Sequence, residues 1–196
     1  MSGADVTALQ TRLSGLGYWN GKADGTYGYV TSQAVIAYQK AAGINADGVA
    51  GPATRAALTK NILPTPRTTF GNALEVDKDK QLLMIVIDGQ LRYVIHVSTG
   101  SGATFLEKGD SNPHVAVTPS GTFAIQRAIN GLRTSKLGTL WRPRYFDDYD
   151  GIAIHGEGVD VPPYPASHGC VRMSDPAIDF IWATNLAPIG RTVLVY

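Results

Sequence analysis

The single cysteine of the chain, Cys170, lies close in sequence to two of its four histidines. His168 stands just before it in the run Ser167-His168-Gly169-Cys170-Val171-Arg172, and His155 ends the short apolar stretch 152–154. A thiol attacks as the thiolate, and a nearby imidazole can both take its proton and stabilise the anion. Because a strand-like stretch would hold His155 rigidly, we expect His155 to be the base and Cys170 the nucleophile.

Two neighbours of the cysteine extend this chemistry. Gly169 permits the close approach of a substrate backbone, and its N–H is expected to bind a developing oxyanion together with the N–H of Cys170. Arg172 carries the planar fork of donors that holds a carboxylate by paired hydrogen bonds. No carboxylate near His155 in sequence is placed to orient its ring, so we expect a backbone carbonyl to do so.

Plainer interpretations of the same residues stay open. A lone cysteine is most often a small buried hydrophobe, and an isolated arginine is most often a surface charge. A Cys and two His also suggest part of a metal site, although three ligands at this spacing need a fourth partner. An upstream basic stretch is either a solvated loop or a basic rim that attracts carboxylates. Its members are Arg127, Arg133, Lys136, Arg142 and Arg144.

Short β-strands are predicted around these residues, from about residue 71 to the end of the chain. The pair Asp88-Gly89 separates two apolar runs, 82–87 and 91–97, as in a hairpin with a two-residue turn. One helix is predicted from Pro176, with Asp175 as its cap. Further strands are predicted at 122–125, 151–155 and 192–196. This part is therefore expected to be a mostly β catalytic domain, β-sandwich-like, with one or two helices.

The N-terminal part follows a helical period instead. Val6, Leu9, Leu13 and Leu16 form one apolar stripe that ends at Gly17. The pattern Asp24-Gly25-x-x-Gly28-x-x-Thr31 recurs as Asp47-Gly48-x-x-Gly51-x-x-Thr54, so a turn precedes a helix twice. We therefore predict a multidomain chain. Its parts are a small all-α three-helix module at 1–63, a proline-containing linker at 64–70 that leaves the module separable, and the catalytic domain at 71–196.

The N-terminal module resembles the three-helix peptidoglycan-binding domain. Members of that family share an opening helix of the form Val-x-x-Leu-Gln-x-x-Leu, then Leu-Gly-Tyr, then repeated Asp-Gly-x-x-Gly turns. The matching residues here are Val6, Leu9, Gln10, Leu13, Leu16, Gly17, Tyr18, Asp24, Gly25, Gly28, Asp47, Gly48 and Gly51. The resemblance implies that the module binds the glycan strands of peptidoglycan.

The residues around Cys170, with Ile154-His155-Gly156 upstream, closely resemble the active-site signature of the L,D-transpeptidases that remodel the bacterial cell wall. The likeness extends to Ser98-Thr99-Gly100, to Thr118-Pro119-x-Gly121-Thr122-Phe123 and to Tyr149-x-Gly151. One segment departs from the pattern. Residues 156–166 form a shorter connection than in many relatives, and they carry prolines at 162, 163 and 165.

This second resemblance implies an enzyme that forms peptidoglycan cross-links. Cys170 would take an acyl group from a tetrapeptide stem with release of D-Ala, and an amine of a second stem would resolve the acyl-enzyme. The resemblance assigns catalysis to Cys170, His155, His168 and Gly169, and substrate binding to Arg172, Ser167, Gly156 and Tyr149. It implies stem peptides as partners, acylation by carbapenems, and neither cofactor nor metal. Two alternatives remain: an L,D-carboxypeptidase that uses water as acceptor, and a non-catalytic peptidoglycan-binding protein.

The composition excludes several other classes. With 44% hydrophobic residues and a net charge of +1, the chain can bury a core and has no basic groove for nucleic acid. No apolar run approaches the roughly 20 residues of a membrane-spanning helix. The first residues lack the basic and apolar regions of a secretory signal. Alone, this predicts a cytoplasmic chain, but it also fits a chain without its export signal. The resemblances favour an extracytoplasmic place, in the cell wall or periplasm.

Overall fold

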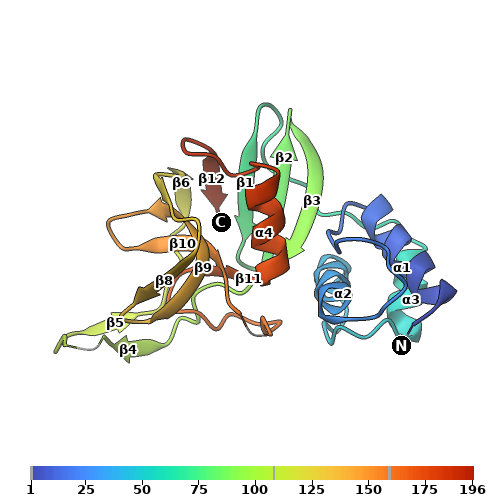
Figure 1. The fold of residues 1–196 in the computed structure, drawn as a ribbon, viewed down its shortest axis with the longest axis horizontal. Helices are drawn as coiled ribbons and strands as arrows, with labels where there is room; N and C mark the ends of the chain where they lie inside the picture. The colour runs from blue at the N-terminus through green and yellow to red at the C-terminus, as the bar shows by residue number, and fades with distance from the viewer. Residues whose placement is uncertain (1, 108, 159) are drawn as a thin grey trace.

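The computed structural model describes residues 2–107, 109–158 and 160–196 of the chain. Three N-terminal helices are followed by a mostly β region with one further helix among these residues (Figure 1). The first three are α1 (Ala4–Gly15), α2 (Tyr29–Ala41) and α3 (Pro52–Leu58). The predicted fold class is therefore confirmed. No helix in the described ranges is long and apolar enough to cross a membrane.

The repeated Asp-Gly turns of the module are two copies of one hydrogen-bond cluster. Asp24 and Asp47 each accept a bond from the backbone N–H two residues further on. Each also accepts one from a buried glutamine amide, Gln10 to Asp24 at 2.9 Å and Gln39 to Asp47 at 2.7 Å. Each amide also donates to the threonine of its own repeat, Thr31 or Thr54, at 2.9 Å. Two glutamines and two threonines thus hold the repeats against the helices.

In the described part of the β region there are two five-stranded sheets and a separate hairpin. The first sheet has the order β3 (Gln90–His96), β2 (Leu82–Ile87), β1 (Ala73–Asp77), β12 (Thr192–Val195), β6 (Gly121–Ala124). The second has the order β11 (Val171–Met173), β10 (Ile152–Gly156), β9 (Gly138–Asp147), β7 (Arg127–Ala128), and β8 (Leu132–Ser135) also pairs with β9. The hairpin joins β4 (Thr104–Leu106) to β5 (Pro113–Val115).

The main core lies between the two sheets and the helix α4 (Asp175–Ala183). Leu74 and Leu83 of the first sheet, Phe146 and Ile154 of the second, and Ile178 of α4 all belong to this buried cluster. Burying apolar side chains from both sheets is the arrangement that defines a sandwich. The expectation of a β-sandwich-like domain with a helix is met.

Two local expectations have different outcomes. The hairpin of β2 and β3 is confirmed, since Asp88 and Gly89 both take positive φ values, 52° and 71°. The cap of α4 is wrong by one residue. The N-cap position is Ser174, without a side-chain capping bond. Asp175 instead accepts a hydrogen bond of 3.0 Å from the N–H of Gly158.

The module packs directly against the first sheet, so the proline linker is not the one connection between the two parts. Its core continues into the first sheet, because Leu82 of β2 and Val94 of β3 pack in one cluster with Leu13 and Tyr38. The linker itself is held down by the buried carboxylate of Glu75, which accepts hydrogen bonds from two linker N–H groups. The first of these contacts brings α2, which carries Tyr38, against β2 and β3. The boundaries at 63 and 70 stay predictions.

Candidate active site

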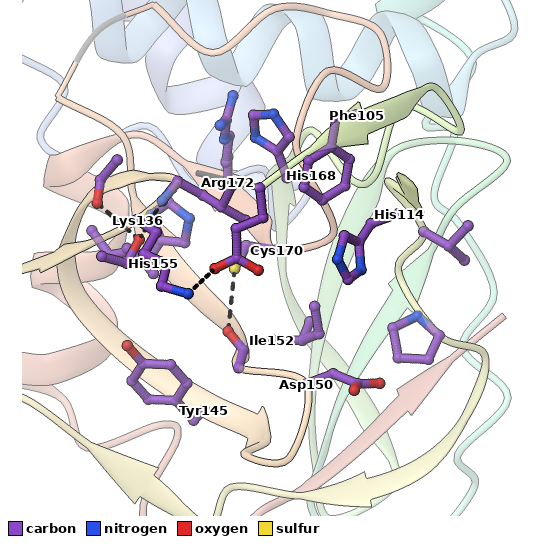
Figure 2. A pocket seen from close by; sticks show the side chains of 18 of the residues that line it. Phe105, His114, Lys136, Tyr145, Asp150, Ile152, His155, His168, Cys170 and Arg172 are labelled. Atoms are coloured by element: carbon purple, nitrogen blue, oxygen red, sulfur yellow. Dashed lines mark hydrogen bonds and ion pairs between the residues drawn. The ribbon is translucent and has the colours of Figure 1, made fainter. Parts of the chain in front are cut away.

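Four of the expected site residues line one cavity of about 600 Å³. They are Cys170, His155, His168 and Arg172, and Figure 2 shows them grouped around the thiol. The walls come from β10 and from two hairpins, β4–β5 and β8–β9. His114 also lines the cavity. A concave site that gathers a nucleophile, three imidazoles and a guanidinium is a good candidate for an active site.

The pairing of β10 with β11 explains why His155 and Arg172 meet. The two strands run parallel, with Ile154 opposite Val171 and His155 opposite Arg172. Side chains alternate between the faces of a strand. Ile154 and Val171 point into the sandwich core, so His155 and Arg172 share the opposite face. The apolar residues around the motif thus fix which of its polar residues reach the cavity.

A tight turn between Ser167 and Cys170 presents the thiol. The Ser167 hydroxyl donates to the carbonyl of Cys170 (2.6 Å) and accepts from the N–H of Gly169 (3.0 Å). Thr118 donates its hydroxyl to the carbonyl of Gly169 (2.6 Å). Gly169 has a φ of +144°, and a Cβ there would lie 2.8 Å from Ile152 Cδ1. Only glycine fits this position.

This turn corrects the expected oxyanion site. The N–H of Gly169 is not free, because the Ser167 side chain accepts its hydrogen bond. Among the described residues, none accepts a hydrogen bond from the N–H of Cys170. Of the two donors expected for a developing oxyanion, the N–H of Cys170 is therefore the one that stays available.

His155 is oriented as a base. Its Nδ1 lies 2.7 Å from the carbonyl oxygen of Gly156, and the ring is 3% exposed. A carbonyl can only accept, so Nδ1 carries the proton and Nε2 keeps its lone pair. The expectation of an orienting backbone carbonyl is confirmed. Burial lowers the pKa of His155 to about 4, with Arg172 adding to the effect and the Gly156 carbonyl opposing it. The ring is therefore neutral at neutral pH.

The thiol of Cys170 is also neutral in this structure. Its sulfur accepts from the N–H of Ala153 at 3.4 Å and donates to the carbonyl of Gly151 at 3.8 Å. Burial raises the pKa of Cys170 to about 11, against the opposing effects of Ala153 and Arg172. His155 is not among the hydrogen-bond partners of the thiol within the described residues. The resting pair is thus thiol and imidazole, and the thiolate has to form as the thiol attacks.

Arg172 is held by residues of the connection between β10 and β11. Its Nε lies 3.0 Å from Glu157 Oε2, and its Nη1 donates to the carbonyl of Ala166 at 3.4 Å. The contact with Glu157 is an ion pair, since the Nε–H has no acceptor in hydrogen-bond geometry in the described part of the chain. Glu157 directly follows His155 and Gly156 in sequence, and this position could have marked it as a residue of the site.

The other expected residues lie outside the cavity lining. Tyr149 is 98% exposed and points to solvent, while its neighbours Asp150 and Gly151 line the cavity. Ser167 lies beneath the turn, where it is 1% exposed. Gly156 packs under α4, and a Cβ on it would lie 2.3 Å from Asp175 Oδ1. These glycine and serine positions build the site without reaching into it.

The hairpins add Phe105, which was not expected from the sequence, and Lys136, one member of the expected basic rim, to the cavity lining. Phe105 of β4 packs edge-on against His168, with ring centroids 4.6 Å apart. Lys136, in the turn between β8 and β9, forms an ion pair of 3.3 Å with Glu107 beside β4. The expected basic rim is otherwise absent from the cavity lining of the described residues. Arg127, for instance, forms an ion pair with Asp148 instead.

The described ranges contain no group of three His, Cys, Asp or Glu side chains arranged to hold a metal ion. His155 and His168, the two histidines expected beside the thiol, contact different residues. His155 faces Gly156, and His168 packs on Phe105. The polar groups at the cavity fit nucleophilic chemistry by the thiol.

Comparison with known families gives two matches along the chain. Residues 2–58 match the family described as "Putative peptidoglycan binding domain", and residues 71–195 match the L,D-transpeptidase catalytic domain. A solved L,D-transpeptidase from Xylanimonas cellulosilytica is 48% identical, with a TM-score of 0.92, over 100% of this chain and 94% of that one. One from Stackebrandtia nassauensis is 25% identical, with a TM-score of 0.59, over 100% and 92%.

Shorter matches of the chain are to two other groups of proteins, amidases and spore cortex-lytic enzymes. The N-acetylmuramoyl-L-alanine amidase CwlM of Mycobacterium tuberculosis is 46% identical over 52 residues, which is 26% of this chain. The spore cortex-lytic enzyme of Bacillus subtilis is 45% identical over 58 residues, 29% of this chain. The matches span only 13% and 19% of those two proteins.

Proposed function

Since this chain belongs to the L,D-transpeptidase family and carries a peptidoglycan-binding domain, we propose that it cross-links peptidoglycan through an acyl-enzyme on Cys170. The donor is a tetrapeptide stem that loses D-Ala, and the acceptor is an amine of a second stem. The protein works outside the cytoplasm, at the cell wall or in the periplasm, where this polymer lies. A thioester intermediate conserves the energy of the amide bond that is broken, so the exchange needs no other energy source.

The acylation step uses the two neutral groups of the resting site. The thiol proton of Cys170 passes to Nε2 of His155 as the sulfur attacks the donor carbonyl carbon. The oxygen of that carbonyl gains negative charge, and the N–H of Cys170 stabilises it. The C–N bond to D-Ala then breaks, and the imidazolium of His155 returns its proton to the leaving amine. The products are a thioester on Cys170 and free D-Ala.

Resolution of the thioester reverses the roles. The amine of the second stem attacks the thioester carbonyl, and His155 takes the proton that this nitrogen loses. The C–S bond breaks, and the sulfur regains a proton from His155. Arg172 binds a carboxylate of a stem peptide, and His168 with Phe105 forms one wall for the bound chain. Water in place of the amine would make the same residues a carboxypeptidase.

The orientation of His155 supports this function most directly. Its Nδ1 is tied to the Gly156 carbonyl at 2.7 Å, and its burial keeps Nε2 unprotonated. A protein that only binds peptidoglycan has no need of a buried, neutral imidazole in one cavity with a thiol.

Product analysis with purified tetrapeptide stems tests the proposal. The wild-type chain is expected to release D-Ala and to form dimers, whereas Cys170→Ala forms neither. Removal of one sulfur costs at most a few kcal/mol of stability, about what a small buried group contributes, so the circular dichroism of the variant should match the wild type. Release of D-Ala without dimers would make the protein a carboxypeptidase. Turnover by a folded Cys170→Ala would contradict the acyl-enzyme.

A further inference from the structure

We propose that helix α2 of the peptidoglycan-binding module is part of the substrate site, because its side chains position Arg172 through the segment 156–166. This inference rests on the proposed function, in which Arg172 binds a stem carboxylate. Lys40, Tyr29 and Gln33 are the positioning residues, and none of them lines the cavity among the described residues. The module would then serve catalysis directly, in addition to holding the enzyme on the wall.

The backbone of Val161 is the point where α2 holds this segment. Val161 is 2% exposed, and its N–H donates to Tyr29 Oη at 3.2 Å. Its carbonyl lies 3.5 Å from Gln33 Nε2 and 3.2 Å from His96 Nε2. Figure 1 shows the segment after β10 reaching toward α2. Both backbone groups of one residue are therefore bonded to side chains, two of which come from the module.

Lys40, near the end of α2, fixes the third of these bonds. Its Nζ lies 2.8 Å from His96 Nδ1, 3.2 Å from the carbonyl of Gln81 and 3.3 Å from that of Val97. The Val161 carbonyl can only accept, so Nε2 of His96 carries the proton that it donates to Val161, and Nδ1 accepts from Lys40. Burial lowers the pKa of His96 to about 3, with Lys40 adding to the effect, so the ring carries one N–H only. By donating to Nδ1, Lys40 stabilises the tautomer of His96 that holds Val161.

The segment that contains Val161 contacts the Arg172 side chain at two residues, one before Val161 and one after it. Glu157, before it, lies 3.0 Å from the Nε of Arg172. Ala166, after it, accepts from Nη1 at 3.4 Å. Prolines at 162, 163 and 165 restrict the backbone between Val161 and Ala166, so a displacement at Val161 is carried to Ala166 rather than absorbed on the way. The guanidinium is thus placed by a segment that the module holds.

The burial of the Lys40 amine indicates that this residue fixes the positions of its neighbours rather than adding to the stability of the fold. Desolvating an amine is costly, and an apolar side chain at this junction would pack without that cost. The three acceptors around Lys40 come from β3 and from residues on either side of the β2–β3 hairpin. A polar network of this kind fixes one arrangement of the parts that it joins.

The test measures acylation of the full chain by a carbapenem that carries a carboxylate. Lys40→Met keeps the length of the side chain and removes its donors, and exposed Lys60→Met is the matched control. Lys40→Met is expected to raise the half-saturating carbapenem concentration about tenfold, the effect of losing one well-placed bond to a charged group, and to leave the limiting rate unchanged. Lys60→Met should change neither.

Two substitutions at His96 distinguish a loss of positioning from a general loss of packing at this junction. His96→Gln keeps an N–H where Nε2 stands, whereas His96→Leu removes it. The half-saturating concentration should therefore stay closer to wild type in His96→Gln than in His96→Leu. An unchanged half-saturating concentration in Lys40→Met, or a fall in limiting rate alone, would overturn the inference.

Amide hydrogen exchange keeps this inference distinct from the proposed function. A wild-type chain that no carbapenem acylates would contradict the function, and the position of Val161 would then be decided by exchange alone. Faster exchange of the Val161 N–H in Lys40→Met than in Lys60→Met would support the inference that α2 holds the backbone of Val161 in place. Equal exchange in the two variants overturns it.

Discussion

The raised pKa of Cys170 determines how its thiol responds to pH. Burial moves this pKa from 9.0 to about 11. Two units lower the thiolate fraction at neutral pH about a hundredfold relative to an ordinary cysteine. Because small alkylating agents react with the thiolate, the alkylation rate of the folded chain should be about a hundredfold below that of the unfolded chain. It should also rise about tenfold per pH unit, without a plateau, from about pH 6 to pH 9.

Stability sets the upper limit of this pH range. The unfolded chain loses its thiol proton near 9.0, and the folded chain keeps it to about 11. The folded state therefore binds more protons between these values, and the contribution of the thiol to stability falls as pH rises through that window. Two units correspond to about 3 kcal/mol, so the assay stays at or below about pH 9.

The assay follows one added iodoacetamide mass on the intact protein, with the chain in denaturant as the reference. His155→Gln should give the same alkylation profile as the wild type, because His155 is not bonded to the resting thiol. A plateau in the alkylation rate near neutral pH would refute the reasoning. It would mean that Cys170 and His155 already form a thiolate–imidazolium pair before substrate binds.

The two histidines and the buried glutamines give further expectations. His155→Gln should lower the acylation rate by about 10² to 10⁴, the usual effect of removing a general base, while His168→Gln, which loses a ring contact, should cost less. Near-normal acylation in His155→Gln together with loss of acylation in His168→Gln would mean that His168, and not His155, is the base. Gln39→Ala should lower the free energy of unfolding by about 2 kcal/mol in a urea titration, since the buried N–H of Gly48 loses its acceptor. An unchanged midpoint would show that the repeats do not depend on their glutamines.

Strands with a clear apolar run could be predicted, including β12, whose partners are distant in sequence, whereas β9 could not. The β2–β3 hairpin follows from two apolar runs and a turn pair, all within one short stretch. The long strand β9 carries Pro143 and two arginines, which break the alternation expected of a strand. Arg142 is paired with Asp179 and Arg144 with the carbonyl of Ala187, so their burial depends on α4 and the segment after it. Nothing near β9 in sequence indicates these partners.

The candidate site divides in the same way. The expectation that His155, Cys170 and Arg172 share one site is met in the cavity, because His155 and Arg172 lie on paired strands flanked by apolar core residues and Cys170 directly precedes the second of these strands. The loss of the Gly169 N–H to Ser167 could not be predicted, since it depends on the exact turn. The contacts of Lys40 with His96 also need the folded junction, because these residues come from different parts of the chain.

Intact-protein mass spectrometry after exposure to a carbapenem tests the acyl-enzyme most directly. A strained lactam carbonyl needs an activated thiol and an oxyanion donor, and its ring-opened product stays attached, so the adduct should accumulate. The wild-type chain is expected to gain one drug mass, and Cys170→Ala none. A wild-type chain that reacts with iodoacetamide but stays unmodified by the carbapenem would show that the cavity offers no oxyanion site at Cys170, and would contradict the catalytic account.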